Sequence, residues 1–212
     1  MRRIALIHAL RHSPPPVEAA FAAIWPGQRL MNLLDDSLSA DLARDGALTP
    51  AMAARFLELA RYAVGTGAEA ILFTCSAFGP CIEAVAAAHP AIPVLKPNEA
   101  MIAEVAASGA RRVGLLASFP GTLSSMPPEF PPGVKIVPML AEGALAALDA
   151  GDAAAHDRLV AEAGARLAGC DAIALGQFSL AHVAPAVQAA TGRPVFSTPG
   201  SAVRMLKARL GG

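Results

Sequence analysis

A segment of about a hundred residues occurs twice in this chain in related form. The stretch EAILFTC at residues 69–75 aligns with DAIALGQ at residues 171–177, and RIALI at residues 3–7 aligns with RVGLL at residues 112–116. In each half, a predicted helix follows residues 69–75 or 171–177, and a short strand entered through proline follows that helix. Repeats of this length indicate two homologous lobes rather than a solenoid.

The apolar segments between the predicted helices are short and continuous, which is typical of strands covered on both faces. They are residues 4–7, 70–73, 93–95, 113–117, 136–137, 172–175 and 194–196. The pairs Thr49-Pro50 and Thr198-Pro199 each predict an N-cap followed by proline at the first helical position. Alternating strands and helices predict parallel sheets. We therefore expect an α/β fold of two pseudo-symmetric lobes, each a parallel sheet flanked by helices, with the active site in the cleft between them.

The repeat also predicts where the lobes begin and end. Residues 1–96 together with 198–212 are expected to form the first lobe, and residues 97–197 the second. The last helix is expected to return and pack on the first lobe.

The charge balance gives no reason to expect a nucleic acid or an anionic membrane as a partner, because Lys+Arg and Asp+Glu number 17 each. No apolar stretch approaches the ~20 residues of a membrane span. The first ten residues resemble a short signal peptide, but His8 and His12 interrupt the apolar run and no cleavage site follows. Three cysteines, an odd number, fit a reducing compartment. We expect a cytoplasmic protein, and the many alanine and leucine positions are compatible with a homodimer.

Ligands of parallel α/β sheets bind beyond the carboxyl ends of the strands. The candidate loops are residues 8–13, 74–79, 117–122 and 176–182. Because of the repeat, Cys75 and Gln177 should occupy equivalent positions and face each other across the cleft. Ser13, Phe178, Ser179 and His182 are further candidates for substrate binding in these loops, with His182 facing either the cleft or solvent.

Cys75 is the principal candidate for chemistry, because a thiol at the start of a helix should have a pKa below its usual ~8.5. The alternative is a buried structural cysteine. Cys81 and Cys170 are not placed at the cleft, and no Cys-x-x-Cys pair predicts structural zinc. A metal shared by His8 and His12 is not expected either.

Ser118 and Thr122 also end a strand and begin a helix, where N–H groups and hydroxyls suit a carboxylate or phosphate. The alternative role for both is helix capping. The sequence contains no glycine-rich nucleotide fingerprint, no P-loop and no Gly-x-Ser-x-Gly elbow. His89 and His156 are expected at the surface.

The two echoing lobes, the motif TCSAFG at residues 74–79 after AILF, and the strand end Leu175-Gly176 resemble the aspartate/glutamate/hydantoin racemase superfamily. This group includes arylmalonate decarboxylase and maleate isomerase, and the resemblance covers essentially the whole chain. In its two-base racemases, one cysteine from each lobe flanks the α-carbon of the substrate. The first corresponds to Cys75, and the second corresponds to position 177, where this chain has glutamine.

An amide has no useful acid or base form near neutral pH, so the two-thiol mechanism is not predicted. Ser179 and His182 are candidate substitutes for the second base. The resemblance implies a small carboxylate substrate, an enediolate-like intermediate, and no metal or organic cofactor. Donors from Ser76, Ala77, Ser118 and Thr122 could then form the oxyanion site.

Three functions stay open at this point. The chain could be a racemase or isomerase acting at the carbon alpha to a carboxylate, with Cys75 as acid/base. It could be a decarboxylase of a malonate-like diacid that protonates one face from Cys75, or a binding protein for small acids. A cysteine hydrolase is disfavoured, because no histidine is placed to activate the thiol.

Overall fold

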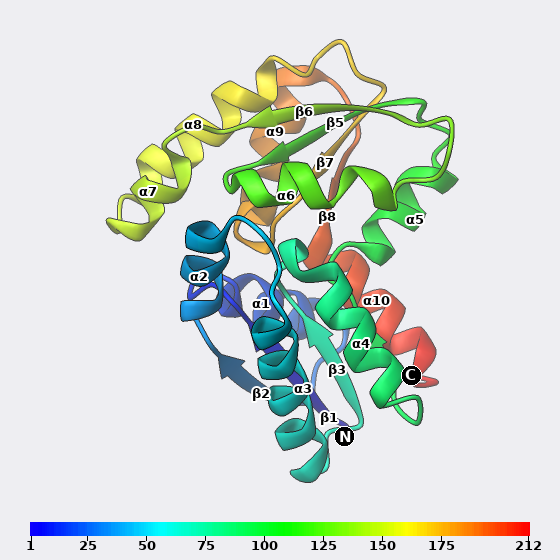
Figure 1. Cartoon of the computed structure of the whole chain (residues 1–212). Coiled ribbons are helices and arrows are strands. Elements are labelled where there is room, and N and C mark those ends of the chain that lie inside the picture. Colours follow the sequence, from blue (N-terminus) through cyan, green and yellow to red (C-terminus); the bar gives the residue numbers. More distant parts are fainter.

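Two four-stranded parallel sheets, one in each lobe, make up the centre of the computed structural model, which describes residues 1–212 (Figure 1). The first has the order β2-β1-β3-β4 and the second the order β6-β5-β7-β8. The strands are β1 (Arg3–His8), β2 (Arg29–Leu34), β3 (Ala70–Phe73), β4 (Val94–Leu95), β5 (Arg112–Ala117), β6 (Lys135–Leu140), β7 (Ala172–Leu175) and β8 (Val195–Ser197). The matching orders confirm the predicted fold class and the internal repeat.

The two sheets also share their register. Ile4 of β1 pairs with Ala70 of β3, and Val113 of β5 pairs with Ala172 of β7. Cys75 and Gln177 each come five residues after these partners in the sequence (70 to 75 and 172 to 177). The two side chains therefore follow equivalent strand ends, as the repeat predicted.

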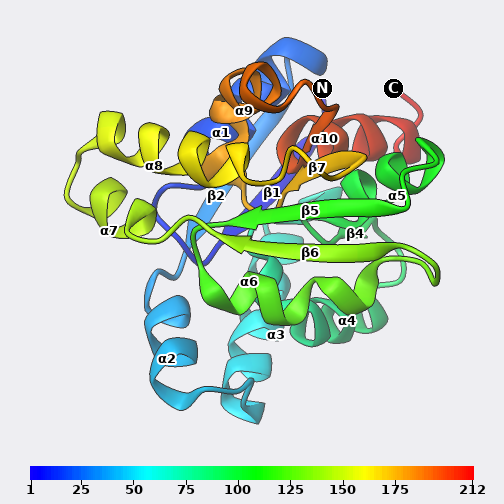
Figure 2. The same ribbon diagram turned by 90° about the horizontal axis from the view of Figure 1, so that it is seen from above.

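Helices cover both faces of each sheet, as Figure 2 shows from above. Those of the first half are α1 (Pro14–Ile24), α2 (Ser37–Asp45), α3 (Pro50–Gly65), the 3-10 turn η1 (Ser76–Phe78) and α4 (Gly79–Ala88). Those of the second half are α5 (Glu99–Ala107), α6 (Pro120–Ser125), the 3-10 turn η2 (Pro127–Glu129), α7 (Ala144–Asp149), α8 (Ala153–Ala165), the 3-10 turn η3 (Phe178–Val183) and α9 (Ala184–Thr191). The last helix is α10 (Thr198–Arg209). None of them combines the length and the apolarity that a membrane crossing requires.

Alternate residues of β1 and β3 enter two different cores, which explains their continuous apolar sequence. Ile7 and Phe73 pack with α3 and α4, whereas Leu6 and Leu72 pack with α1 and α10. The last helix thus packs on the first lobe, as predicted, through residues such as Leu206. The residue bounds of the two lobes stay a prediction.

Three local features differ from the expectations. Helix α10 begins at Thr198 with Ser197 as its N-cap, one residue earlier than predicted, whereas the Thr49 hydroxyl does cap α3 by accepting from the N–H of Met52. The sequence did not predict the edge strand β2, because its residues are only partly buried and do not form a continuous apolar run. His156 was expected at the surface but is fully buried in α8.

Candidate active site

Cys75 and Gln177 line the same small cavity, at the carboxyl ends of β3 and β7. Its volume is about 10 Å³, and it is lined by Leu10, Ser13, Thr74, Cys75, Ser76, Phe119, Thr122, Gln177, Phe178 and Ser179. None of these side chains carries a charge. The two lobes meet here, so that each contributes one of the two residues the repeat made equivalent.

The Cys75 thiol is a neutral acid in this structure. Burial raises its pKa to about 11, and hydrogen bonds with the Ala77 N–H and the Ser39 hydroxyl lower it too little to compensate. The prediction of a lowered pKa was therefore wrong. Only the three-residue turn η1 follows the thiol directly, while the surrounding side chains exclude water from the sulfur.

Gln177 is held in one orientation by the loop after β5. Its Oε1 accepts the N–H of Ser118 at 2.5 Å, the N–H of Phe119 at 3.0 Å and the Ser118 hydroxyl at 3.2 Å. Its Nε2 is buried and has no hydrogen-bond partner. An amide held by its oxygen leaves two N–H donors available for an acceptor.

Ser76 joins the two lobes beside the thiol. Its hydroxyl lies 3.1 Å from the Thr122 hydroxyl and donates to the Gly176 carbonyl at 3.2 Å, while the Ser76 carbonyl accepts from Ser125 at 3.3 Å. A side chain at position 176 would lie 2.9 Å from Thr122, so glycine permits this close approach. The cavity has about the volume of a single water, so in this structure these contacts close the space beside the thiol.

Several of the predicted oxyanion donors are already bonded within the protein. Ser118 donates both its N–H and its hydroxyl to Gln177, and the Ala77 N–H faces the sulfur of Cys75. The hydroxyls of Ser76 and Thr122 bond each other. Among the polar groups of this site, the Gln177 amide is the buried donor group without a partner.

A series of side-chain hydrogen bonds, not anticipated from the sequence, leads from the cavity to the surface. His8 Nδ1 lies 2.8 Å from the Thr74 hydroxyl, and its Nε2 lies 2.9 Å from Asn32 Oδ1. Asn32 Nδ2 donates to Glu18, so Oδ1 must accept from His8, and Nδ1 then accepts the Thr74 proton. Burial lowers the pKa of His8, against the raising effects of the Asn32 hydrogen bond and the Glu18 charge, which keeps the ring neutral. The available signal was the position of His8 at a strand end.

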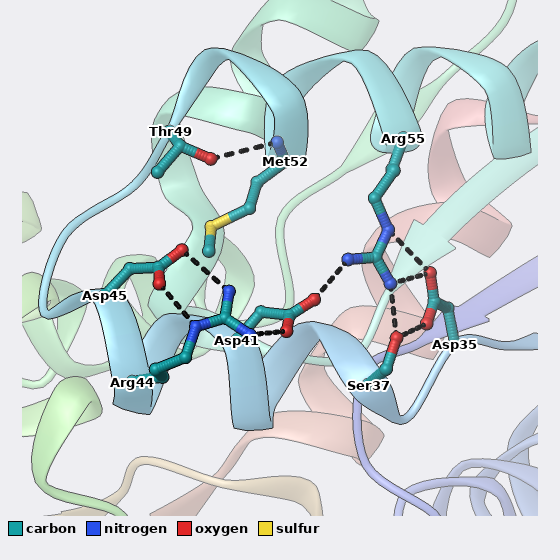
Figure 3. Close-up of polar contacts among 8 residues, drawn as sticks. All are labelled: Asp35, Ser37, Asp41, Arg44, Asp45, Thr49, Met52 and Arg55. Atoms are coloured by element: carbon teal, nitrogen blue, oxygen red, sulfur yellow. Dashed lines mark hydrogen bonds and ion pairs between the residues drawn. The ribbon is translucent and has the colours of Figure 1, made fainter.

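Ser39 of α2 bonds Cys75 and was not predicted as a site residue from the sequence. Ion pairs hold the segment that contains α2 against α3. Arg55 of α3 donates to Asp35 and Asp41 at the two ends of its guanidinium, at 2.5 Å and 2.6 Å (Figure 3). Burial raises the pKa of Asp35, but hydrogen bonds from Arg55 and Ser37 outweigh it and lower that pKa overall. The Ser39 hydroxyl donates to the Ala9 carbonyl at 2.7 Å, which positions it beside the sulfur, and its one proton would turn from Ala9 to bond a Cys75 thiolate.

The family model described as Asp/Glu/Hydantoin racemase matches residues 16–206. The chain belongs to the Asp/Glu/hydantoin racemase family. A comparison with curated proteins found no match.

Solved structures with this fold include racemases and a decarboxylase. Glutamate racemase from Francisella tularensis subsp. tularensis SCHU S4, in complex with D-glutamate, has a TM-score of 0.76 at 16% identity, covering 99% of this chain and 81% of that one. Allantoin racemase from Klebsiella pneumoniae has 0.73 at 20% identity, covering 100% and 88%. A glycine-to-cysteine mutant of arylmalonate decarboxylase has 0.67 at 20% identity, covering 99% and 94%. At these identities the likeness establishes the fold.

The structure brings most of the predicted site residues of this family member together. Ser13, Ser76, Thr122, Phe178 and Ser179 line the cavity with Cys75 and Gln177. Ser118 and Ala77 do not line the cavity, but each bonds a residue that does: Ser118 bonds Gln177, and the Ala77 N–H bonds Cys75. His182 does not line the cavity: its side chain is half exposed and bonds Asp157 of α8.

Two larger cavities adjoin the first, and Phe119 lines all three. One, of about 280 Å³, contains Arg11, His12 and Asp149, with His12 Nε2 2.8 Å from Asp149. The other, of about 630 Å³, lies between α2 and α6 and is mostly apolar. Charged and apolar side chains therefore both lie next to the small cavity.

Proposed function

We propose that this chain is a cofactor-independent enzyme that protonates one face of a carbanion next to a carboxylate, with Cys75 as the acid. Decarboxylation of a malonate-like diacid is the reaction that the site supports best. The bond from the α-carbon to one carboxylate breaks, CO₂ leaves, and the electron pair stays on the α-carbon as an enediolate. The Cys75 S–H then gives its proton to that carbon, and the thiolate regains a proton from solvent.

The observation that carries this proposal is Gln177 at the position equivalent to Cys75. Its Oε1 is fixed by Ser118 and Phe119, and its Nε2 is buried without a partner. A buried amide N–H without an acceptor costs free energy, which a bound carboxylate or enediolate oxygen would recover. Gln177 thus stabilises charge on its side of the substrate, and proton transfer is left to Cys75.

The protonation state of Cys75 supports the same assignment. With its pKa near 11, the thiol carries its proton at neutral pH. Such a group is a competent donor to a carbanion, whereas abstraction of an α-proton would require the minor thiolate form. Loss of CO₂ forms the carbanion without any base.

The uncharged lining of the cavity bears on the substrate. It has neither a carboxylate to pair with an α-ammonium group nor a cation to pair with a carboxylate, so hydrogen-bond donors such as the Gln177 amide would have to hold a bound acid. Electrostatic support for the enediolate would come from hydroxyls and amides in a site shielded from water.

Racemisation or isomerisation at the α-carbon is the second candidate function, supported by family membership and by racemases of the same fold. It requires a base on the side of Gln177. Ser179 is the candidate there, since it lines the cavity. A cytoplasmic location and a homodimer remain part of the proposal; the three free, buried cysteines support the former.

The test is to incubate the protein in D₂O with aryl- and alkylmalonates, aspartate, glutamate and hydantoins, and to follow them by NMR. We expect loss of one carboxylate from a malonate and a single deuterated enantiomer of the product. Exchange of an α-hydrogen without loss of carbon would establish the racemase or isomerase instead. Saturable binding of these acids without turnover would identify a binding protein.

A further inference from the structure

A cluster of two histidines and one carboxylate lies outside the candidate active site. His156 and Asp157 are adjacent on α8, and His182 is on η3. Asp157 Oδ1 lies 2.8 Å from His156 Nδ1 and 2.6 Å from His182 Nε2, and the three ligand atoms lie within 4.8 Å of one another. The imidazole rings stack at 5.7 Å with an interplanar angle of 19°.

We propose that His156, Asp157 and His182 form a binding site for a transition-metal dication of the Zn²⁺ type. Two imidazoles and a carboxylate are a common donor set for such ions, with a fourth position left to water. The ion would be a structural metal that links α8 to η3, and it would take no part in the chemistry at Cys75.

The spacing of the donors brackets that required by the ion. Tetrahedral zinc with bonds of about 2.0–2.2 Å separates its ligand atoms by about 3.3 Å. The two pairs that now share a hydrogen bond would open by roughly half an ångström, and the two imidazole nitrogens, which lie within 4.8 Å of each other, would close by up to about 1.5 Å. Asp157 and His182 have side chains 43% and 52% exposed, so they can rotate and can receive an ion from solvent.

The burial and the hydrogen bonds of His156 indicate which of its ring nitrogens faces the other two donors. His156 is fully buried, and its Nε2 has no partner. The buried ring is thus held mainly through Nδ1, the atom that would coordinate the ion.

A metal at this place would act on the segment that follows Gln177. Residues of η3 include Phe178 and Ser179, which line the Cys75 cavity, whereas His182 leaves the same turn in the direction of α8. A bound ion would therefore hold η3 to α8 and stabilise the folded state.

The test is titration of the metal-free protein with Zn²⁺ by calorimetry, and with Co²⁺ by absorption. We expect one equivalent bound with micromolar affinity, a tetrahedral Co²⁺ spectrum without a thiolate charge-transfer band, and a Tm raised by about 5 °C at a hundredfold excess over Kd. Mg²⁺, which prefers six oxygen ligands, should not compete.

Asp157→Asn and His182→Ala change exposed groups, so both variants should fold, and each should weaken Zn²⁺ binding at least tenfold. His89→Ala, a change outside the cluster, should bind as the wild type does. Absence of saturable binding, binding unchanged in both cluster variants, or a thiolate band in the Co²⁺ spectrum would overturn the proposal. His156→Ala is not needed, because removal of a buried ring could unfold the chain.

Discussion

Cys75 and Gln177 follow strand ends with the same register, but Cys75 is a buried acid and Gln177 is an amide that can only form hydrogen bonds. The residues that follow β5, Ser118 and Phe119, give three hydrogen bonds to Gln177. By the shared register, the residues that follow β1 at the same places are Ala9 and Leu10, and the Ala9 carbonyl accepts a bond from Ser39 instead. One lobe therefore fixes a neutral hydrogen-bonding group, and the other buries a neutral acid.

This comparison indicates how a symmetric scaffold supports asymmetric chemistry. Ser76 of the first lobe and Phe178 of the second follow equivalent strand ends, yet Ser76 bonds across the interface and Phe178 enters the core of the first lobe. In the proposed mechanism, the proton comes to the substrate from Cys75, and Gln177 contributes only hydrogen bonds. The following predictions test that difference, from the largest expected effect to the smallest.

Cys75→Ala should reduce the rate of product formation by about 10³-fold or more, because it removes the proton donor. The fold should survive, since alanine leaves a small gap. Turnover is measured by NMR and folding by the circular-dichroism melt. Cys81→Ala is the matched control, since that thiol is buried in α4 and does not line the cavity. Wild-type turnover in Cys75→Ala would remove this residue from the mechanism.

Substitutions at Gln177 should separate its two roles. Gln177→Glu keeps oxygen acceptors for Ser118 and Phe119 but replaces the free amide donor with an anion, so kcat should fall about 10²-fold. Gln177→Cys places a thiol on the opposite face, and should create exchange of the product's α-hydrogen with D₂O and its racemisation.

Ser13→Ala, a change of a hydroxyl in the same cavity, is the comparison for general disturbance of the site. If Gln177→Glu turned over like the wild type, the free amide would have no part in charge stabilisation. If Gln177→Cys bound an acid but exchanged no hydrogen, the two positions would not face the same carbon.

The pH profile should have a single alkaline limb. A thiol that acts as an acid is active in its protonated form, so the rate stays level through neutral pH and falls as the pH rises toward about 11. Two thiols would instead give a bell-shaped profile. The raised pKa also means that folding favours the neutral thiol. Its contribution to the free energy of unfolding is fully present below the unfolded-state pKa of ~8.5, and it is lost as the pH rises through the folded-state pKa of about 11.

Ser39→Ala sharpens the same measurement. It removes a hydrogen bond that lowers the pKa of Cys75, so the alkaline limb should move further up. The effect on the rate at neutral pH should be small. A rate that rises with pH through the neutral range would show that the thiolate, acting as a base, is the active form.

The sequence by itself determined the repeat, seven of the eight strands, the parallel α/β class and the equivalence of Cys75 and Gln177. These follow from local pattern: continuous apolar runs encode buried strands, and equal spacing in the two halves encodes equal register. The return of α10 to the first lobe was also predicted, and its apolar face at Val203 and Leu206 packs there.

Only the tertiary structure decided the chemistry of the site. The pKa of Cys75 rises because residues far apart in the sequence bury the sulfur, and this desolvation outweighs the lowering effects of the Ala77 N–H and of Ser39 from α2. The free Gln177 amide depends on donors from a loop about 60 residues earlier, and the buried state of His156 depends on packing around α8. Burial and hydrogen-bond partners are set by residues far apart in the sequence, so local patterns could place these side chains but not assign their charge or their bonds.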